Sequence, residues 1–352
     1  MKKKKLVIYG SYGYTGNLIA ELSSNLSADV VLSGRSREKL QEQSERLSIP
    51  YIVADLKNSS QMDELLSDAD VVIHCAGPFV HTYKSMAEAC IRNSCHYLDI
   101  TGEIEVFEGL KKKSEKFNSA NIMAMPGVGF DVVPTDCMAA WLHQKMPDAT
   151  HLELAFKGLG GGVSRGTAKT MIENLGKGGA VRRKGQIINV PPAYKTRSIT
   201  VKDQQFKVVS IPWGDVSTAH FSTGIKNIIV YTAIPDKTIK KMKWLPFINP
   251  LLKLGIVKFF LKQSVNKRPP GPDENKRETG RSYIWGEVRN QKGDIVESTM
   301  EVAEGYRLTS EMALIIAEKV LDGIWESGYQ TPSKVYGADL ILESNNSFRL
   351  DN

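Results

Sequence analysis

The chain has 352 residues, 41% of them hydrophobic and 24% charged, with a net charge of +7. This composition is typical of a globular protein, and the length allows two domains with a sizeable core. The modest positive charge is spread along the chain without a nucleic-acid-binding motif, so no nucleic acid is expected as a partner.

The four cysteines form no Cys-x-x-Cys pair and have no metal-ligand spacing with the six histidines. We therefore expect no metal site, and reduced thiols in a cytoplasmic protein. The apolar run after the N-terminal lysines is too short for a signal peptide.

The beginning of the chain predicts a dinucleotide-binding unit. Residues 5–9 have the pattern of a buried strand, and they lead into Gly10, Gly13 and Gly16, which open a helix. A second apolar run follows at residues 30–32. This order cradles a pyrophosphate, because glycine permits the tight turn and the helix N-terminus attracts the anion.

The end of the second strand indicates which nucleotide is bound. An acidic residue there would bond the ribose hydroxyls of NAD(H). This chain instead has Arg35 followed by Ser36. A guanidinium suits phosphate oxygens, and the serine can both cap the next helix and bond a 2′-phosphate. The sequence therefore favours NADP(H), with a solvated charge cluster at a helix start as the alternative.

Strands and helices continue to alternate as far as residue 127. Four further apolar runs have the length of strands: 51–55, 71–74, 97–100 and 122–125. The pattern predicts an α/β fold with a doubly wound parallel sheet, whose ligands bind beyond the carboxyl ends of the strands. We therefore expect Asp55, Gly77–Pro78 and Thr101–Gly102 to line the cofactor site.

The regular alternation of strands and helices ends after Asp131. A helix is expected at 135–146, followed by β-type runs at 151–156, 186–190, 198–201, 206–211, 225–233 and 281–288. They predict a second α+β domain on a mainly antiparallel sheet. The expected division is a Rossmann domain at 1–130 and a substrate and closure domain at 131–352. A helix at 309–326, opened by a capping-box pattern at Thr309–Met312, could pack back on the first domain.

The segment 244–261 is strongly apolar and about long enough to span a bilayer. Two prolines, a glycine and internal lysines argue against a span. Two interpretations stay open. As a basic amphipathic segment it would lie on a membrane surface and make the protein membrane-peripheral. Alternatively, its helices cover a hydrophobic pocket or a homodimer contact.

Motifs over almost the entire chain resemble the saccharopine dehydrogenase-like NADP-binding oxidoreductases, in the branch that includes trans-acting enoyl reductases. These motifs are Tyr9–Gly16, Gly34–Ser36, Ala76–Phe79, Tyr97–Glu103, Gly127–Asp136, Ser164–Thr167, Trp213–Val216, Trp285–Glu287 and Gly328–Pro332. The resemblance implies a Rossmann domain that carries NADP(H) and a second domain that closes over the nicotinamide.

The resemblance also implies roles for individual residues. The pyrophosphate would be held by Gly10, Tyr12, Gly13, Tyr14, Thr15 and Gly16. The 2′-phosphate would contact Arg35 and Ser36, the adenine edge Asp55 and Leu56, and the nicotinamide ribose Ala76, Gly77 and Pro78. The chain shares with this family the lack of a Tyr-x-x-x-Lys pair, so the resemblance says little about proton transfer.

The catalytic candidates come from loops at the strand ends. Glu103, which directly follows Thr101–Gly102, is our first candidate, and Tyr83, just after Phe79, is the second. Each has a structural alternative: Glu103 as an acid at a helix N-terminus, and Tyr83 as a core residue. Asp131 and Asp136 flank the crossing between the domains.

Three functions are compatible with these features. The first is an NADP(H)-dependent oxidoreductase that reduces a C=C, C=O or imine bond of a largely apolar or lipid-like small molecule. The second is a saccharopine-type imine reductase of an amino-acid substrate, which would need clustered Arg or Lys side chains to hold carboxylates. The third is a non-catalytic, membrane-peripheral NADP(H)-binding protein.

Overall fold

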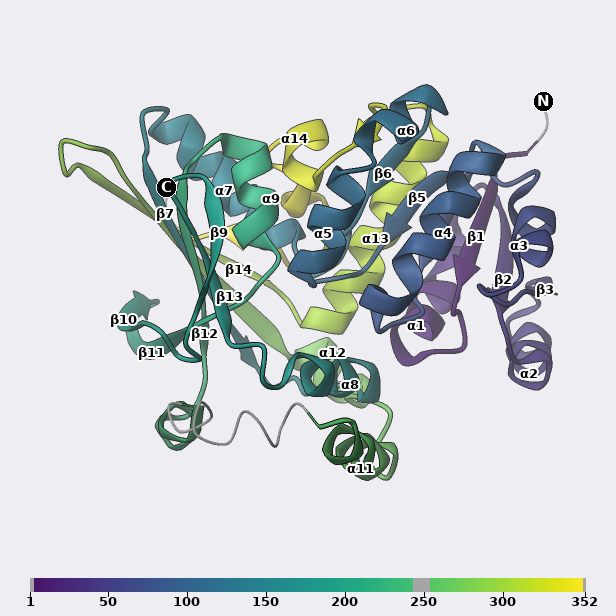
Figure 1. Cartoon of the computed structure of the whole chain (residues 1–352), viewed down its shortest axis with the longest axis horizontal. Helices are drawn as coiled ribbons and strands as arrows, with labels where there is room; N and C mark the ends of the chain where they lie inside the picture. The colour runs from purple at the N-terminus through teal and green to yellow at the C-terminus, as the bar shows by residue number, and fades with distance from the viewer. Residues whose placement is uncertain (1–2, 243–253, 351–352) are drawn as a thin grey trace. The chain divides into compact units, whose positions relative to one another are not determined.

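The structure is a computed structural model that describes residues 3–242 and 254–350 (Figure 1). The chain forms two compact units, the first comprising residues 1–133 and 306–335, the second residues 134–305 and 336–352. The segment predicted at 244–261 lies outside the described residues up to residue 253. Among the helices that the structure describes, none is long and apolar enough to cross a membrane.

The first unit is built on a parallel sheet, seven-stranded within the described residues, with the order β15-β6-β5-β4-β1-β2-β3. The strands are β1 (Lys5–Tyr9), β2 (Asp29–Gly34), β3 (Tyr51–Val53), β4 (Val71–His74), β5 (His96–Asp99), β6 (Met123–Met125) and β15 (Gly328–Tyr329). The direction of strand order reverses between β1 and β4, which is where doubly wound sheets bind dinucleotides.

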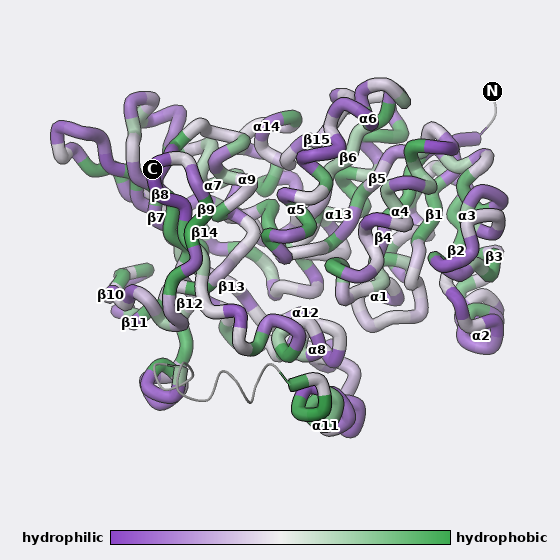
Figure 2. Tube along the Cα trace, in the orientation of Figure 1, coloured by the Kyte–Doolittle hydropathy of each residue, from purple (hydrophilic) through white to green (hydrophobic). Residues whose placement is uncertain are grey.

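Helices connect these strands. They are α1 (Tyr14–Leu22), the short η1 (Ser23–Asn25), α2 (Arg37–Leu47), α3 (Ser59–Leu66), α4 (Phe79–Asn93), α5 (Ile104–Lys111), α6 (Ser114–Ser119) and α13 (Gly305–Leu321). Leu6, Val7 and Ile8 of β1 are fully buried. Such an uninterrupted apolar run marks a strand that is covered on both faces. By contrast, α2 is mostly hydrophilic (Figure 2).

Helix α13 differs from its sequence prediction. It begins at Gly305 and ends at Leu321, so Thr309–Met312 lies within the helix and is not its N-terminus. The Thr309 hydroxyl instead accepts a hydrogen bond from the backbone amide of Phe130, at 3.0 Å. This residue therefore supports the loop after β6, a contact across 179 positions of sequence that no local pattern indicates.

The second unit is built on another sheet, nine-stranded in the part of the chain that the structure describes. Its main path is β10-β11-β12-β7-β13-β14-β16, with β8 paired to β12 and β9 paired to β8. The strands are β7 (His151–Leu159), β8 (Gly179–Arg183), β9 (Gln186–Val190), β10 (Thr196–Val201), β11 (Gln204–Ile211), β12 (Asn227–Ala233), β13 (Arg281–Arg289), β14 (Ile295–Ala303) and β16 (Phe348–Arg349). Only β12 and β7 pair in parallel among these strands. The predicted α/β fold with a mainly antiparallel second sheet is confirmed.

Helical segments that follow residue 132 outside α13 include α7 (Val133–Lys145), α8 (Arg165–Asn174), α9 (Asp215–Thr223), α11 (Gly255–Asn266), α12 (Glu274–Thr279), α14 (Pro332–Tyr336) and the short η2 (Leu340–Glu343). Residues 236–242 are helical as well. Helix α7 packs tightly on the sheet at Gly286 of β13. A Cβ atom at this glycine would lie 2.6 Å from Cδ1 of Leu142 and 2.7 Å from Cγ of Met138. The absence of a side chain at Gly286 thus sets how closely the helix approaches.

We expect Gly286→Ala to lower the free energy of unfolding by about 1–3 kcal/mol, because the added methyl group overpacks the contact with α7. Gly158→Ala is the matched control, since Gly158 also lies in a strand and its added Cβ would have its nearest neighbour at 3.9 Å. Urea denaturation of both variants measures the difference. Equal stabilities would contradict the packing described here.

Candidate functional site

The turn after β1 depends on close backbone contacts. Gly10 has φ +80°, a conformation that favours glycine, and a Cβ atom there would lie 2.9 Å from the backbone nitrogen of Ala76. A Cβ atom at Gly16 would collide with the carbonyl oxygen of Gly10. These contacts hold the start of α1 against the end of β1 and beside the loop after β4.

The N-terminus of α1 is suited to an anion. Gly13 is its N-cap and has no side chain to accept the first amides, and the first turn contains no acidic residue. The first turn of a helix presents amides without intrahelical acceptors and the positive end of the helix dipole. Tyr14, Thr15 and Gly16 form this turn, and the ring of Tyr14 packs edge-on against Tyr306, with centroids 5.0 Å apart.

Arg35 and Ser36 link β2 to α2. Arg35 is exposed, and Ser36 is the N-cap of α2, but its side chain makes no capping hydrogen bond. The ring of Tyr12 lies against Gly34, where a Cβ atom would approach Cε1 of the ring to 2.6 Å. The ammonium group of Lys39 lies 5.7 Å from the centroid of the same ring. The carboxyl end of β2 thus offers a guanidinium and a hydroxyl to a phosphate.

The end of β3 carries Asp55 and Leu56. The Asp55 carboxylate accepts a hydrogen bond from the amide of Lys57 at 3.0 Å, so it is used within its own turn. The buried hydroxyl of Tyr9 donates to the carbonyl of Ala54 at 3.1 Å. Burial raises the pKa of Tyr9 to about 12, so its hydroxyl stays a neutral donor at physiological pH.

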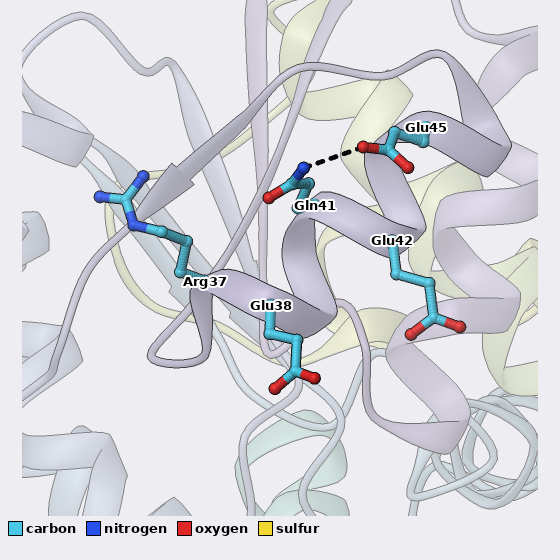
Figure 3. A pocket seen from close by; sticks show the side chains of 5 residues that line it. All are labelled: Arg37, Glu38, Gln41, Glu42 and Glu45. Carbon is cyan, nitrogen blue, oxygen red and sulfur yellow. Dashed lines mark hydrogen bonds between the residues drawn. The ribbon is translucent and has the colours of Figure 1, made fainter.

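A hollow on the outer face of α2 lies next to Ser36 in sequence. It is lined by Arg37, Glu38, Gln41, Glu42 and Glu45, all from one helix (Figure 3). The amide of Gln41 donates to the Glu45 carboxylate at 3.0 Å. The carboxylates of Glu38, Glu42 and Glu45 would repel a nucleotide phosphate, so we assign no part of the nucleotide to this hollow.

The loop after β4 is held by a chain of polar contacts. Nε2 of His74 lies 2.9 Å from the Thr82 hydroxyl, which in turn lies 2.9 Å from the carbonyl of Ala76. Burial lowers the pKa of His74 to about 3, so the ring is neutral. Because the threonine proton is donated to Ala76, the Nε2–H of His74 is the donor to Thr82. In the same loop, the peptide bond between Gly77 and Pro78 is cis.

Glu103, our first catalytic candidate, is buried and binds backbone. Its carboxylate accepts hydrogen bonds from the amides of Phe79, at 2.9 Å, and Val80, at 3.3 Å. These are the first two residues of α4, directly after Pro78. Glu103 thus ties the end of β5 to the start of α4, and it stabilises the positive end of that helix.

Tyr83, our second candidate, is buried in α4, 4% exposed. Its hydroxyl lies against Gly109 of α5, in a place that a Cβ atom on that glycine would occupy. The structure therefore places the Tyr83 hydroxyl between two helices, whereas the Glu103 carboxylate lies at the N-terminus of one of them.

Asp131, on the loop after β6, has a raised pKa, although the sequence pattern indicated only that it flanks a domain crossing. A Cβ atom at Gly102 would lie 2.7 Å from Oδ2 of Asp131, so the glycine admits this carboxyl to the end of β5. The residue as a whole is half-buried. Burial, together with the negative charge of Glu103, raises the pKa of Asp131 to about 7.

Asp99, at the end of β5, braces the loops around this site. One carboxylate oxygen accepts the amides of Thr101 and Gly127, both at 3.0 Å, and the other accepts the hydroxyl of Tyr97 at 2.5 Å. Burial raises the pKa of Asp99 to about 6 in spite of these bonds. Since its hydrogen-bonding capacity is largely used by these groups, we assign Asp99 a structural role.

Comparison with known proteins shows what the first unit is similar to. Residues 6–125 match the family model described as the saccharopine dehydrogenase NADP binding domain. The chain is 26% identical over 213 residues to the rat saccharopine dehydrogenase-like oxidoreductase, covering 53% of this chain and 50% of the relative. It is 31% identical over 151 residues to the trans-acting enoyl reductase of Mycobacterium leprae, covering 40% and 36%. The matches span half or less of these relatives.

The fold is similar to that of apo saccharopine dehydrogenase (L-Glu forming) from Saccharomyces cerevisiae. The TM-score is 0.67 at 13% sequence identity, and the match covers 99% of this chain and all of the other. These findings confirm the predicted resemblance to saccharopine dehydrogenase-like oxidoreductases and the prediction of NADP(H) as the nucleotide.

The raised pKa of Asp131 predicts a pH-dependent stability. The native carboxyl holds its proton up to about pH 7, whereas the unfolded one loses it near pH 4, so the free energy of unfolding falls as pH rises between these values. From pH 5 to pH 8 the free energy of unfolding should fall less in Asp131→Asn than in the wild type. The two decreases should differ by on the order of 1–3 kcal/mol. Urea denaturation at both pH values is the measurement. Parallel losses would contradict the shift, since the contribution of Asp99 is common to both proteins.

Proposed function

We propose that this chain, whose residues 6–125 form a saccharopine dehydrogenase NADP-binding domain, is an NADP(H)-dependent oxidoreductase that reduces a C=C, C=O or imine bond. The observation that carries the proposal is that the glycine turn after β1 and Asp131, a carboxyl whose pKa is raised to about 7, lie on loops at the carboxyl ends of one sheet. NADPH supplies a hydride when bound. Reduction of such bonds then requires a proton, which a positioned acid provides.

We assign the nucleotide to the loops of the first unit. The glycine contacts and the open N-terminus of α1 support a pyrophosphate held by Gly10, Tyr12, Gly13, Tyr14, Thr15 and Gly16. Arg35 and the Ser36 hydroxyl would bind the 2′-phosphate. Asp55 and Leu56 would border the adenine, and Ala76, Gly77 and Pro78 the nicotinamide ribose.

We assign Asp131 as the general acid. A pKa near 7 lets a carboxyl both hold a proton at neutral pH and give it up readily. Glu103 would act as a positioning residue, because both of its oxygens accept amides at the start of α4. The catalytic roles predicted for Glu103 and Tyr83 are the alternatives that the kinetic test below distinguishes.

We further propose a largely apolar or lipid-like substrate. The similarity to a protein named a trans-acting enoyl reductase supports it. Two of the arginines that could hold the carboxylates of an amino-acid substrate donate hydrogen bonds inside the second unit. Arg182 is buried and donates to the carbonyls of Val216 and Gly185, and Nε of Arg165 donates to the carbonyl of Arg268. This disfavours a saccharopine-type imine substrate.

The nucleotide assignment predicts a preference that depends on Arg35. We expect the wild type to bind NADPH at least about tenfold more tightly than NADH, about 1.4 kcal/mol. Arg35→Asp is expected to lose this preference, because a carboxylate repels the 2′-phosphate. Arg37→Asp is the matched control, an exposed arginine two positions on that faces the hollow of Figure 3. Titration of each protein with both nucleotides is the measurement, and a preference that survives in Arg35→Asp would overturn the assignment.

The acid assignment predicts a kinetic difference between carboxyls. In a screen of α,β-unsaturated acyl thioesters, long-chain ketones and imines, followed by NADPH absorbance, we expect turnover by the wild type. Asp131→Asn should lower kcat by about 10²–10⁴-fold with an unchanged Kd for NADPH. Glu103→Gln and Tyr83→Phe should retain more activity than Asp131→Asn.

Two results would revise this proposal. A larger loss in Glu103→Gln or Tyr83→Phe than in Asp131→Asn would move the acid to that residue. Binding of NADPH without turnover of any substrate class would favour the non-catalytic NADP(H)-binding protein.

A further inference from the structure

Helix α11 of the second unit is amphipathic, with its apolar face turned to solvent. Ile256, Phe259 and Phe260 have the i, i+3, i+4 spacing of one helical face. Their side chains are 66%, 56% and 65% exposed, and Leu254 just before the helix is 48% exposed. Globular proteins normally bury such a face.

The opposite face of α11 is attached to α8 by its lysines. The ammonium group of Lys258 donates to the backbone carbonyl of Glu173 at 2.7 Å, and that of Lys262 pairs with the Glu173 carboxylate. Val265 packs in a small cluster with Ala168 and Ile172. Two charged groups thus point inward and two phenylalanines outward, so the contact with α8 fixes the orientation of the apolar face.

All charged residues in the sequence around this face are positive. Between Asp236 and Asp273 it contains nine Lys or Arg residues and no Asp or Glu. At the carboxyl end of α11, Lys267 and Arg268 are exposed. An exposed aromatic face within a stretch of unbalanced positive charge combines the two attractions that hold a helix in a lipid interface.

The charge also distinguishes between occupants of the face. Although Lys262 pairs with Glu173 in each copy, the stretches themselves contain no carboxylate, so the remaining positive charges of a second copy would repel those of the first. An anionic lipid surface has the complementary charge. We propose that α11 docks on an anionic membrane surface, with Ile256, Phe259 and Phe260 inserted among the acyl chains and Lys267 and Arg268 at the headgroups.

Sedimentation of the full chain with vesicles tests this inference. We expect binding to vesicles of phosphatidylcholine with phosphatidylserine, and weaker binding to phosphatidylcholine alone. Phe259→Ser/Phe260→Ser should bind at least about tenfold more weakly, because two apolar side chains no longer enter the acyl region. Lys267→Gln/Arg268→Gln should weaken binding to the anionic vesicles by about fivefold for each charge removed. This effect of the substitutions should be smaller at high salt, because salt screens the attraction to the headgroups.

Ile295→Ser/Ile324→Ser is the matched control, because these two apolar side chains are 57% and 54% exposed elsewhere on the chain. It should bind vesicles as the wild type does. Failure of the wild type to bind the anionic vesicles, or equal binding by the phenylalanine variant, would overturn the proposal. So would a dimer in gel filtration that the phenylalanine variant converts to a monomer without any binding to vesicles.

This inference is independent of the proposed reductase activity. The nucleotide site lies in the first unit and α11 in the second, so titration with NADPH should give the same Kd for all three variants and the wild type. That titration verifies folding, and it keeps a failure of membrane binding separate from a failure of nucleotide binding.

Discussion

The candidate site depends on the close approach of two loops, the glycine turn after β1 and the start of the loop after β4. At Gly10 a Cβ atom would meet the backbone of Ala76, and at Gly16 it would meet the carbonyl of Gly10. No side chain can be repositioned to relieve such contacts, because the neighbours are backbone. The open end of α1 can therefore lie at the reversal of strand order, where a pyrophosphate is bound.

A second level of organisation comes from carboxylates that bind backbone amides. Asp99 holds the loops after β5 and β6, and Glu103 holds the start of α4. Asp131 differs from both, because Gly102 lets it approach the end of β5, and burial together with the negative charge of Glu103 raises its pKa. Three acids close together thus acquire different properties from their partners.

The sequence predicted the strands and helices around the glycine turn well, because its signals are local, whereas the contacts of Arg35 and Ser36 with a nucleotide stay a prediction. Glycines, strand ends and the Arg35–Ser36 pair all lie within one strand–helix–strand unit. The second sheet was predicted less completely. The predicted strands did not include β8, β14 and β16, although β14 pairs with β13 along nine residues. The raised pKa of Asp131 could not be predicted, because it arises from burial beside Gly102 and from the charge of Glu103, both nearly thirty positions away in sequence. Likewise, no local pattern indicated which amides Glu103 would bind.

The pairing of β15 with β6 has a consequence for synthesis of the chain. The first unit is discontinuous, since residues 306–335 supply both this edge strand and the Thr309 hydroxyl that holds Phe130. A nascent chain therefore cannot complete its nucleotide-binding unit when residue 133 leaves the ribosome, although domains usually fold in order from the N-terminus. The intervening residues must emerge first, and the edge of β6 stays exposed to other strands until Gly328 and Tyr329 arrive.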